Sequence, residues 1–198
     1  MTRLRSALLA TCACAGIAVA GIASAAAQDR SFSIDPNSLL RGGTATVGTG
    51  GIELSKSGDG SFWINFVAPT DHTDNTPITV RVYMQRIFLP ATCVAATQLM
   101  VAMRRRAGKT QWFTSAPNVD GIKPVGGVET TTFPAAANTI VAKNYVVRAP
   151  QAAPFRKLVA GDGIMLELGR SPASASDTCP GSVFVSQIEV KYTSTAAP

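Results

Sequence analysis

Apolar and polar residues alternate along most of this chain, and this period of two is the feature that most constrains its fold. The segment 78–88 is an example, in which four apolar positions alternate with Thr79, Arg81, Tyr83 and Gln85. Such alternation is typical of a strand with one buried and one exposed face. Beyond residue 27, no segment sustains the apolar spacing of an amphipathic helix. The sequence therefore predicts an all-β protein.

The strand pattern recurs in segments that are separated by turn signals. Clear segments are 62–68, 78–88, 97–104, 110–114, 140–148, 164–168 and 183–192, and weaker ones are 38–47, 52–55 and 122–132. Gly-containing turns at 57–60, 126–127 and 160–163 divide them, and a Gly-containing loop at 105–109 joins two of them as a hairpin. About nine or ten short strands with such turns predict an antiparallel β-sandwich of jelly-roll type.

Two finer expectations follow from the same pattern. Strict alternation in 183–192 places Phe184 and Ser186 on the face of Ile188, opposite Val183 and Val185. The segments 28–31 and 193–198 are small and polar, so they are expected to be tails.

The first 27 residues have the three parts of a secretory signal peptide. Arg3 and Arg5 supply a positive start, 8–22 is an apolar stretch, and Ala27 ends a run of alanines suited to cleavage before Gln28. We expect cleavage after residue 27, export to the periplasm or the exterior, and no membrane span afterwards. Residues 28–198 are then enough for a single β-sandwich domain. An uncleaved membrane anchor and a lipid anchor on Cys12 are the alternatives.

Cleavage would leave two cysteines, Cys93 and Cys179, in a compartment where disulfides persist. We expect them to be bonded to each other. The bridge would close a loop of 86 residues, for which the chain-entropy model gives about 4 to 5 kcal/mol. The alternative, a reactive or metal-binding thiol pair, usually has closer spacing and supporting histidines.

A cluster of cations is the first candidate binding site. Arg104, Arg105, Arg106 and Lys109 lie at the predicted hairpin loop, and Trp112 follows them. Guanidinium groups beside an aromatic ring suit anionic glycans or phosphates. A solvated loop that prevents edge-to-edge aggregation would have the same composition. The net charge of +6, or +4 without Arg3 and Arg5, is otherwise spread along the chain, so we expect no nucleic-acid partner.

Aromatic residues supply the second candidate site. By alternation, Trp63 and Tyr83 lie on the strand faces opposite Ile64 and Val82, where they could stack on sugar rings if those faces point outward. Packing beneath loops and contacts between subunits are the alternative roles of such residues.

The segment 71–77 contains the third candidate. Asp71, Asp74 and Asn75 offer oxygen ligands for Ca²⁺, and His72, the only histidine of the chain, lies among them. The alternative is an ordinary loop in which Asp and Asn bond to their own backbone. One histidine does not fill the coordination sphere of a transition metal, and we expect no cofactor.

No set of residues in the sequence demands catalysis. A serine nucleophile would have only His72 as its base, and the chain has no Gly-x-Ser-x-Gly motif. Carboxylate pairs can arise by chance in any sandwich with 12 acidic residues.

The C-terminal half of the sequence resembles a known group of domains. The segments 160–170, 176–178 and 183–192, with 66–71 and 79–83 before them, are similar to strands of jelly-roll domains in phage tail and virion proteins. The resemblance implies a fibre or a binding tip, often a trimer. The predicted signal peptide and the cysteine pair depart from that pattern.

These observations lead to one expectation of function and two alternatives. We expect an exported, non-catalytic β-sandwich module that binds a glycan or another anionic surface ligand, or that assembles with itself. The alternatives are a hydrolase or lyase that acts on glycans, and a phage-derived receptor-binding head captured for export.

Overall fold

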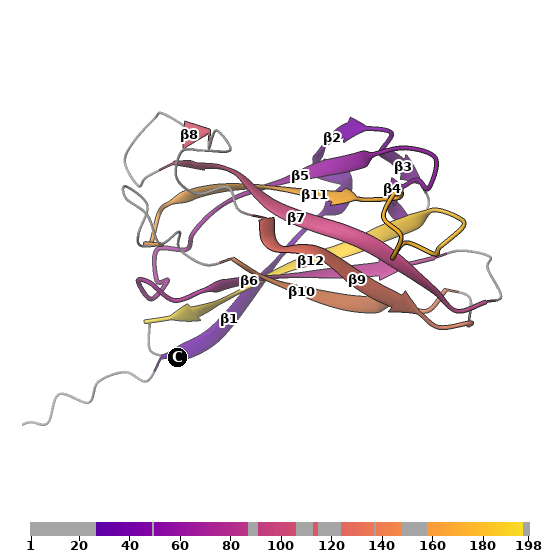
Figure 1. The fold of residues 1–198 in the computed structure, drawn as a ribbon. Coiled ribbons are helices and arrows are strands. Elements are labelled where there is room, and N and C mark those ends of the chain that lie inside the picture. Colours follow the sequence, from indigo (N-terminus) through magenta and orange to yellow (C-terminus); the bar gives the residue numbers. More distant parts are fainter. Residues whose placement is uncertain are drawn as a thin grey trace, which may run out of the picture.

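The computed structural model describes residues 27–195, apart from positions 49, 87–90, 106–112, 115–123, 137 and 148–157. For 99–105, 113–114 and 124–127 it describes the backbone alone. The described residues form two six-stranded antiparallel sheets that lie face to face as two layers (Figure 1). Among them, no helix is long and apolar enough to cross a membrane.

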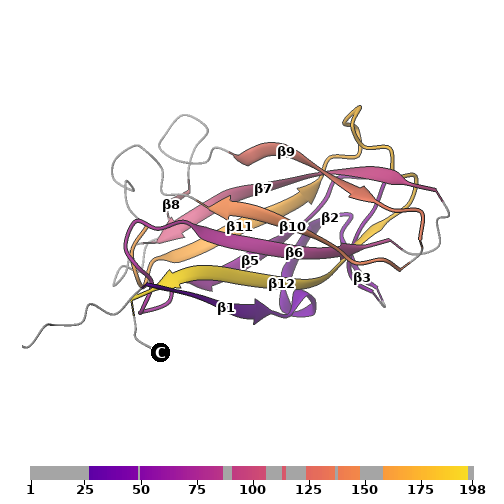
Figure 2. The ribbon, with the colours of Figure 1, turned by 90° about the horizontal axis from the view of Figure 1, so that it is seen from below.

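Sheet A includes the strands β1, β6 and β10 in the lower part of Figure 1. Its strands follow the order β10, β6, β12, β4, β3, and β1 pairs with β12 next to β4. Figure 2 shows β1, β12, β6 and β10 side by side. The bounds are β1 (Gln28–Ile34), β3 (Thr46–Gly48), β4 (Gly51–Leu54), β6 (Ile78–Gln85), β10 (Val141–Val147) and β12 (Val183–Ser194).

Sheet B includes the strands β2, β5, β7, β8 and β11 in the upper part of Figure 1. Its strands follow the order β2, β5, β11, β7, β8, and β9 pairs with β7. The pairing of β7 with β8 confirms the predicted hairpin. The bounds are β2 (Leu40–Gly43), β5 (Gly60–Val67), β7 (Cys93–Arg105), β8 (Phe113–Thr114), β9 (Pro124–Phe133) and β11 (Gly163–Arg170).

The strand pairs are nested along the sequence. The outermost pair is β4 with β12, followed by β5 with β11, β6 with β10, and β7 with β9. Successive pairs belong alternately to sheet A and sheet B. This is the double Greek-key order of a jelly roll, which confirms the predicted fold class.

The core lies between the two layers. Burial of each large apolar side chain contributes about 1.5 to 3 kcal/mol, and β-branched residues suit the pleated surface. Alternate side chains of five strands are fully buried: Ile52, Leu54, Phe62, Ile64, Ile78, Val80, Val82, Met84, Ile164, Leu166, Leu168, Val183, Val185, Ile188 and Val190.

One expectation for the last strand was wrong. The register of β12 against β6 shifts between Val185 and Gln187, so Ser186 is an extra residue on β12. A β-bulge of this kind changes the face on which the following side chains lie. Val185 and Ile188 are therefore both in the core, although strict alternation separates them.

Two other expectations also need correction. Residues 28–31 are not a tail, because β1 pairs with β12 along its whole length, and residues 193 and 194 belong to β12. The expected strand 38–47 is two strands in different sheets. Between them Gly43 adopts φ 59°, and an added Cβ would lie 2.0 Å from the carbonyl oxygen of Asp59. Only glycine fits this position, where the chain turns from sheet B to sheet A.

Candidate functional site

Trp63 lies on the outer side of sheet B. It is half-buried, whereas Phe62 and Ile64 on either side of it are fully buried in the core, so the predicted alternation is confirmed here. Its register partners are Leu40 on β2 and Glu167 on β11. Side chains opposite each other in a sheet lie on the same face. We call the outer side of β2, β5 and β11 around this residue the Trp63 face.

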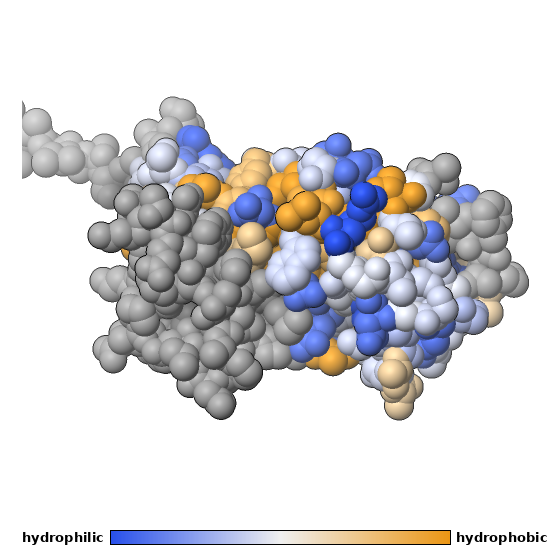
Figure 3. All heavy atoms as spheres, turned by 90° about the horizontal axis from the view of Figure 1, so that it is seen from above, coloured by the Kyte–Doolittle hydropathy of each residue, from blue (hydrophilic) through white to orange (hydrophobic). Residues whose placement is uncertain are grey.

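The Trp63 face combines apolar and polar groups. Leu40 is 73% exposed and Val67 is 51% exposed. Figure 3 views this side of the molecule and shows apolar side chains gathered among polar ones. Within the described part of the chain, the indole N–H of Trp63 and the carboxylate of Glu167 make no hydrogen bond or ion pair.

Small residues lie directly beside the indole. Gly42 on β2, Ser61 on β5 and Gly169 on β11 form the next row of the sheet. A Cβ at Gly42 would lie 3.2 Å from the Ser61 hydroxyl oxygen and 3.7 Å from Trp63 Nε1. The row thus keeps one side of the indole free of bulky neighbours.

The basic hairpin belongs to the same sheet. Arg105, near the end of β7, pairs with Gly163 on β11, which pairs with Val67 on β5. Val67 is four residues from Trp63, so Arg105 lies about 13 Å along the strands and about 10 Å across them from Trp63. Arg104 pairs with Ile164 and with Phe113. Arg106, Lys109 and Trp112 lie outside the described residues.

Tyr83 lies on the outer side of sheet A, on the opposite side of the sandwich from Trp63. Its hydroxyl donates to Glu189 Oε2 at 3.0 Å, and Arg81 lies 5.3 Å from the centre of its ring. Burial raises the pKa of Tyr83, and the hydrogen bond to Glu189 raises it further. The two aromatics expected as ligand-binding residues therefore cannot form one continuous surface.

Asp71 joins the loop after β5 to the end of β12. Its carboxylate accepts hydrogen bonds from the hydroxyls of Ser194, at 2.7 Å, and Tyr192, at 3.1 Å. It also pairs with Arg30 of β1 at 3.2 Å. The hydrogen bond from Ser194 is the main cause that lowers the pKa of Asp71.

His72 is buried next to Asp71, with 3% of its surface exposed. Its Nε2 lies 3.2 Å from the hydroxyl oxygen of Thr76, and Nδ1 has no hydrogen bond to the described residues. Burial lowers the pKa of His72. The described residues include no group of three or more His, Cys, Asp or Glu side chains placed to hold a metal. Calcium binding by Asp71, Asp74 and Asn75 stays a prediction.

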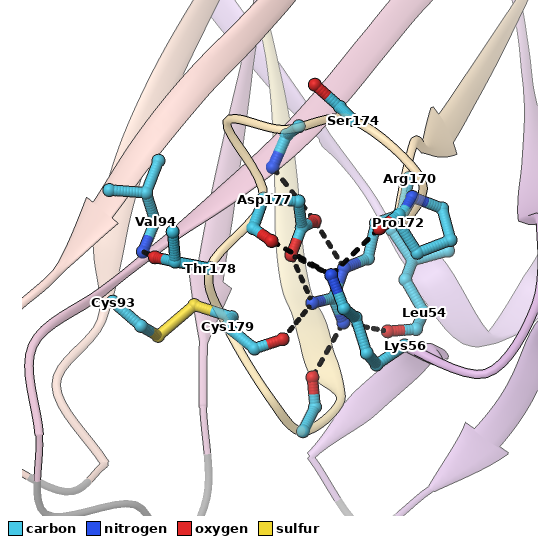
Figure 4. Close-up of polar contacts among 12 residues, drawn as sticks. Leu54, Lys56, Cys93, Val94, Arg170, Pro172, Ser174, Asp177, Thr178 and Cys179 are labelled. Atoms are coloured by element: carbon cyan, nitrogen blue, oxygen red, sulfur yellow. Dashed lines mark hydrogen bonds and ion pairs between the residues drawn. A yellow bond between two sulfur atoms is a disulfide. The ribbon is translucent and has the colours of Figure 1, made fainter.

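A buried ion pair lies at the other end of the sandwich, beside the disulfide (Figure 4). Arg170 at the end of β11 pairs with Asp177 at 2.9 Å, and Lys56 lies 3.1 Å from the same carboxylate. Burial alone would raise the pKa of Asp177, but hydrogen bonds from Arg170, the Ala96 amide and Lys56 lower it overall. This ion pair was not predicted from the sequence. Alternation along β11 could have found it, because Leu168 and Arg170 share the inner face.

The predicted disulfide is confirmed. Cys93 and Cys179 are bonded, and their exposed fractions are 4% and 1%. Cys93 begins β7, and Cys179 lies in the segment between β11 and β12. The bond therefore joins two segments that lie 86 residues apart in the sequence.

Comparisons with known proteins give only distant likenesses. No family model matches the sequence, and no curated protein does. The isomalto-dextranase of Arthrobacter globiformis T6, solved with panose, aligns with a TM-score of 0.43 and 14% identity over 82% of this chain and 23% of that one. An exo-β-1,3-galactanase of Phanerochaete chrysosporium, solved with β-1,3-galactotriose, aligns with a TM-score of 0.38 and 13% identity over 81% of this chain and 29% of that one.

A viral structure aligns to the same extent. The infectious bursal disease virus Gx strain gives a TM-score of 0.38 and 12% identity over 85% of this chain and 34% of that one. The chain thus spans about a quarter to a third of the length of these proteins. The jelly-roll assignment rests on the strand pairing, and the resemblance to phage tail proteins stays a prediction.

Proposed function

We propose that this chain is an exported, non-catalytic module that binds a glycan on the Trp63 face. The observation that carries the proposal is the outward indole of Trp63, with Glu167 opposite it on β11 and neither group engaged within the described residues. An unpaired indole N–H and an unpaired carboxylate beside a flat aromatic ring suit a ligand with both apolar faces and hydroxyl groups.

A sugar ring has this chemistry. Its C–H face can pack on the indole, while its hydroxyls donate to Glu167 and accept from the Trp63 N–H. The exposed side chain of Leu40 extends the apolar surface on the other side of the indole. The row of small residues at Gly42, Ser61 and Gly169 leaves room for a ring to lie beside it.

The basic hairpin favours an acidic glycan that extends beyond the first ring. Arg104 and Arg105 lie at the end of the same sheet, and Arg106 and Lys109 follow them in the sequence. An oligosaccharide of several residues can span the distance of about 13 Å along the strands from Trp63. In this arrangement a neutral sugar contacts Trp63 and Glu167, and an anionic group extends to the end of β7 at Arg105.

The acid content of the Trp63 face favours binding over hydrolysis. Glycoside hydrolysis normally uses two carboxylates that flank the scissile bond. Among the described outward residues of β2, β5 and β11, Glu167 is the only acid. A hydrolase or lyase at this face would need a second acid from elsewhere.

The test is binding of the exported protein to an array of neutral and acidic glycans. Trp63→Ala should weaken binding by about 1 to 2 kcal/mol, or about five- to thirtyfold, because it removes the stacking surface. Glu167→Gln should weaken it less, and an Arg104/Arg105/Arg106→Ser variant should lose the acidic glycans first.

Tyr83→Ala is the matched control, because it truncates an aromatic on the opposite sheet. It should leave glycan binding unchanged. Equal binding by the Trp63→Ala variant and the wild-type protein, at equal thermal stability, would exclude the Trp63 face as the site.

A further inference from the structure

Strand β1 is held at the rim of sheet A. Within the described chain it pairs only with β12, through register pairs that run from Gln28↔Ser194 to Ile34↔Ile188. None of its seven residues is fully buried, whereas β6 and β12 each supply several core residues. Figure 2 shows β1 at the border of the sheet. Phe32 and Ile34 of β1 pack against the edge of the core, but the fully buried residues of the described core all lie outside β1.

The side chains of β1 rest on a surface that other strands complete. Phe32 lies 5.9 Å from the ring of Phe66 and 6.4 Å from the ring of Tyr192, as distances between ring centres. Arg30 pairs with Asp71, and both side chains are partly exposed. These contacts involve one face of β1, and they can form equally well with a β1 that belongs to another molecule.

Two strands, β4 and β1, pair with the same edge of β12. β4 covers Val183 to Val185, and β1 covers Ile188 to Ser194. Without β1, the backbone N–H and C=O groups of Ile188 to Ser194 that face β1 would be unpaired, next to the apolar rings of Phe66 and Tyr192. Such an edge is a template for an added strand.

The connection after β1 suits a hinge. Pro36 is buried and begins the turn η1, and the Asp35 carboxylate accepts from the Asn37 amide at 2.9 Å. Asp35 has φ −70° and ψ 117°, and a residue before proline is restricted to such extended backbone. The turn can thus stay on the body of the domain while β1 projects from it as an extended strand.

We propose that β1 of one copy of this chain exchanges onto the β12 edge of a second copy. The exchanged pair regenerates the same ladder, the same aromatic contacts and the same Arg30–Asp71 ion pair. The free-energy difference between the closed and exchanged forms is then set by the hinge and by protein concentration. The occupant is a second copy because β1 already carries the side chains that match this edge.

A cross-linking experiment tests the exchange. Ser31 on β1 pairs with Lys191 on β12, and Lys191 pairs on its other side with Thr79 on β6. Paired residues of antiparallel strands have Cα atoms about 4.5 to 5.5 Å apart, which suits a disulfide. One protein carries Ser31→Cys and the other Lys191→Cys, and the two are purified after export, mixed, incubated and oxidised.

The matched control mixture contains Thr79→Cys and the same Lys191→Cys protein. β6 is paired on both sides, by β10 and β12, so it cannot exchange without unfolding. A single chain with both Ser31→Cys and Lys191→Cys should form the intrachain bridge in dilute solution, which shows that the substitutions keep the register. The native disulfide is buried and should not compete.

The expected result is an intermolecular 31–191 bridge, identified by peptide mass, in a fraction of the chains that rises about tenfold when the dilute protein is concentrated about tenfold. The 79–191 bridge should stay at background. Equal yields of the two intermolecular bridges at every concentration would overturn the proposal. Glycan binding is not part of the readout, so the result is independent of the Trp63 face.

Discussion

The guanidinium of Arg170 donates to both carboxylate oxygens of Asp177, with Nε–Oδ2 and Nη2–Oδ1 distances of 2.9 Å. Its remaining N–H groups donate to the carbonyl oxygens of Leu54, Cys179 and Gly181. All five donors of this buried side chain are thus satisfied. Because Leu54 ends β4 and Gly181 precedes β12, Arg170 connects the end of sheet B to sheet A.

Arg170→Met should destabilise the fold by about 3 to 5 kcal/mol, because it leaves the buried carboxylate of Asp177 without its main partner. The free energy of unfolding, from urea titration at neutral pH, measures the effect. Lys56→Met removes a cation that is about one-third exposed, so its cost should be near 1 kcal/mol. Equal losses of unfolding free energy in Arg170→Met and Lys56→Met would contradict the prediction that Arg170 is the main partner of Asp177.

The same pair predicts how stability depends on acid. The pKa of Asp177 is lower in the folded protein than in the unfolded chain, where it is about 3.9. Its contribution is therefore complete above that value and is lost as pH falls through the lower pKa of the folded state. Urea midpoints of the wild-type protein should decline below about pH 4. Asp177→Asn should be less stable at neutral pH, and its urea midpoint should change less with pH below about pH 4.

Titration of His72 should change the stability of the fold in a higher pH range than titration of Asp177. Burial lowers its pKa below 6.5, so the folded state binds fewer protons than the unfolded chain between the two values. Stability should fall as pH decreases from about 6.5 through the pKa of the folded state. Thermal midpoints at pH 7.5 and 5.5 measure this fall, and His72→Gln should reduce it. An unchanged pH dependence in the variant would show that His72 is not the titrating group.

Loss of the disulfide should weaken the domain without changing its fold. Backbone hydrogen bonds from Thr178 and Cys179 to the Val94 carbonyl, at 2.8 and 3.0 Å, hold the same two segments together. The Cys93→Ala/Cys179→Ala variant should lose about 2 to 5 kcal/mol of stability and keep its β circular-dichroism spectrum. Guanidinium titration measures the loss. A spectrum of an unfolded chain would show that the bond is needed for folding.

Several features of the fold could be read from residue patterns alone. The alternation around Trp63 and Tyr83 places both side chains outward, because a strand in a sandwich has one buried face. The disulfide followed from two cysteines left after residue 27. The bulge at Ser186 could not be read in this way, because an extra residue in a strand is defined only by the register of the partner strand.

The candidate site was predicted less completely. Trp63 and Tyr83 have the same local pattern, but only strand pairing assigns β5 to sheet B and β6 to sheet A. The partners of Asp71 are equally remote, since Tyr192 and Ser194 lie more than a hundred residues away in the sequence.

The sequence by itself determined the all-β class, the alternation of buried and exposed positions and the cysteine pair, because each depends on the residue types of short segments. The tertiary structure decided which faces share a surface, that β1 closes the edge of β12, and that Arg170 meets Asp177 in the interior. These features depend on contacts between distant segments, and local periodicity does not specify which strands pair or in which register.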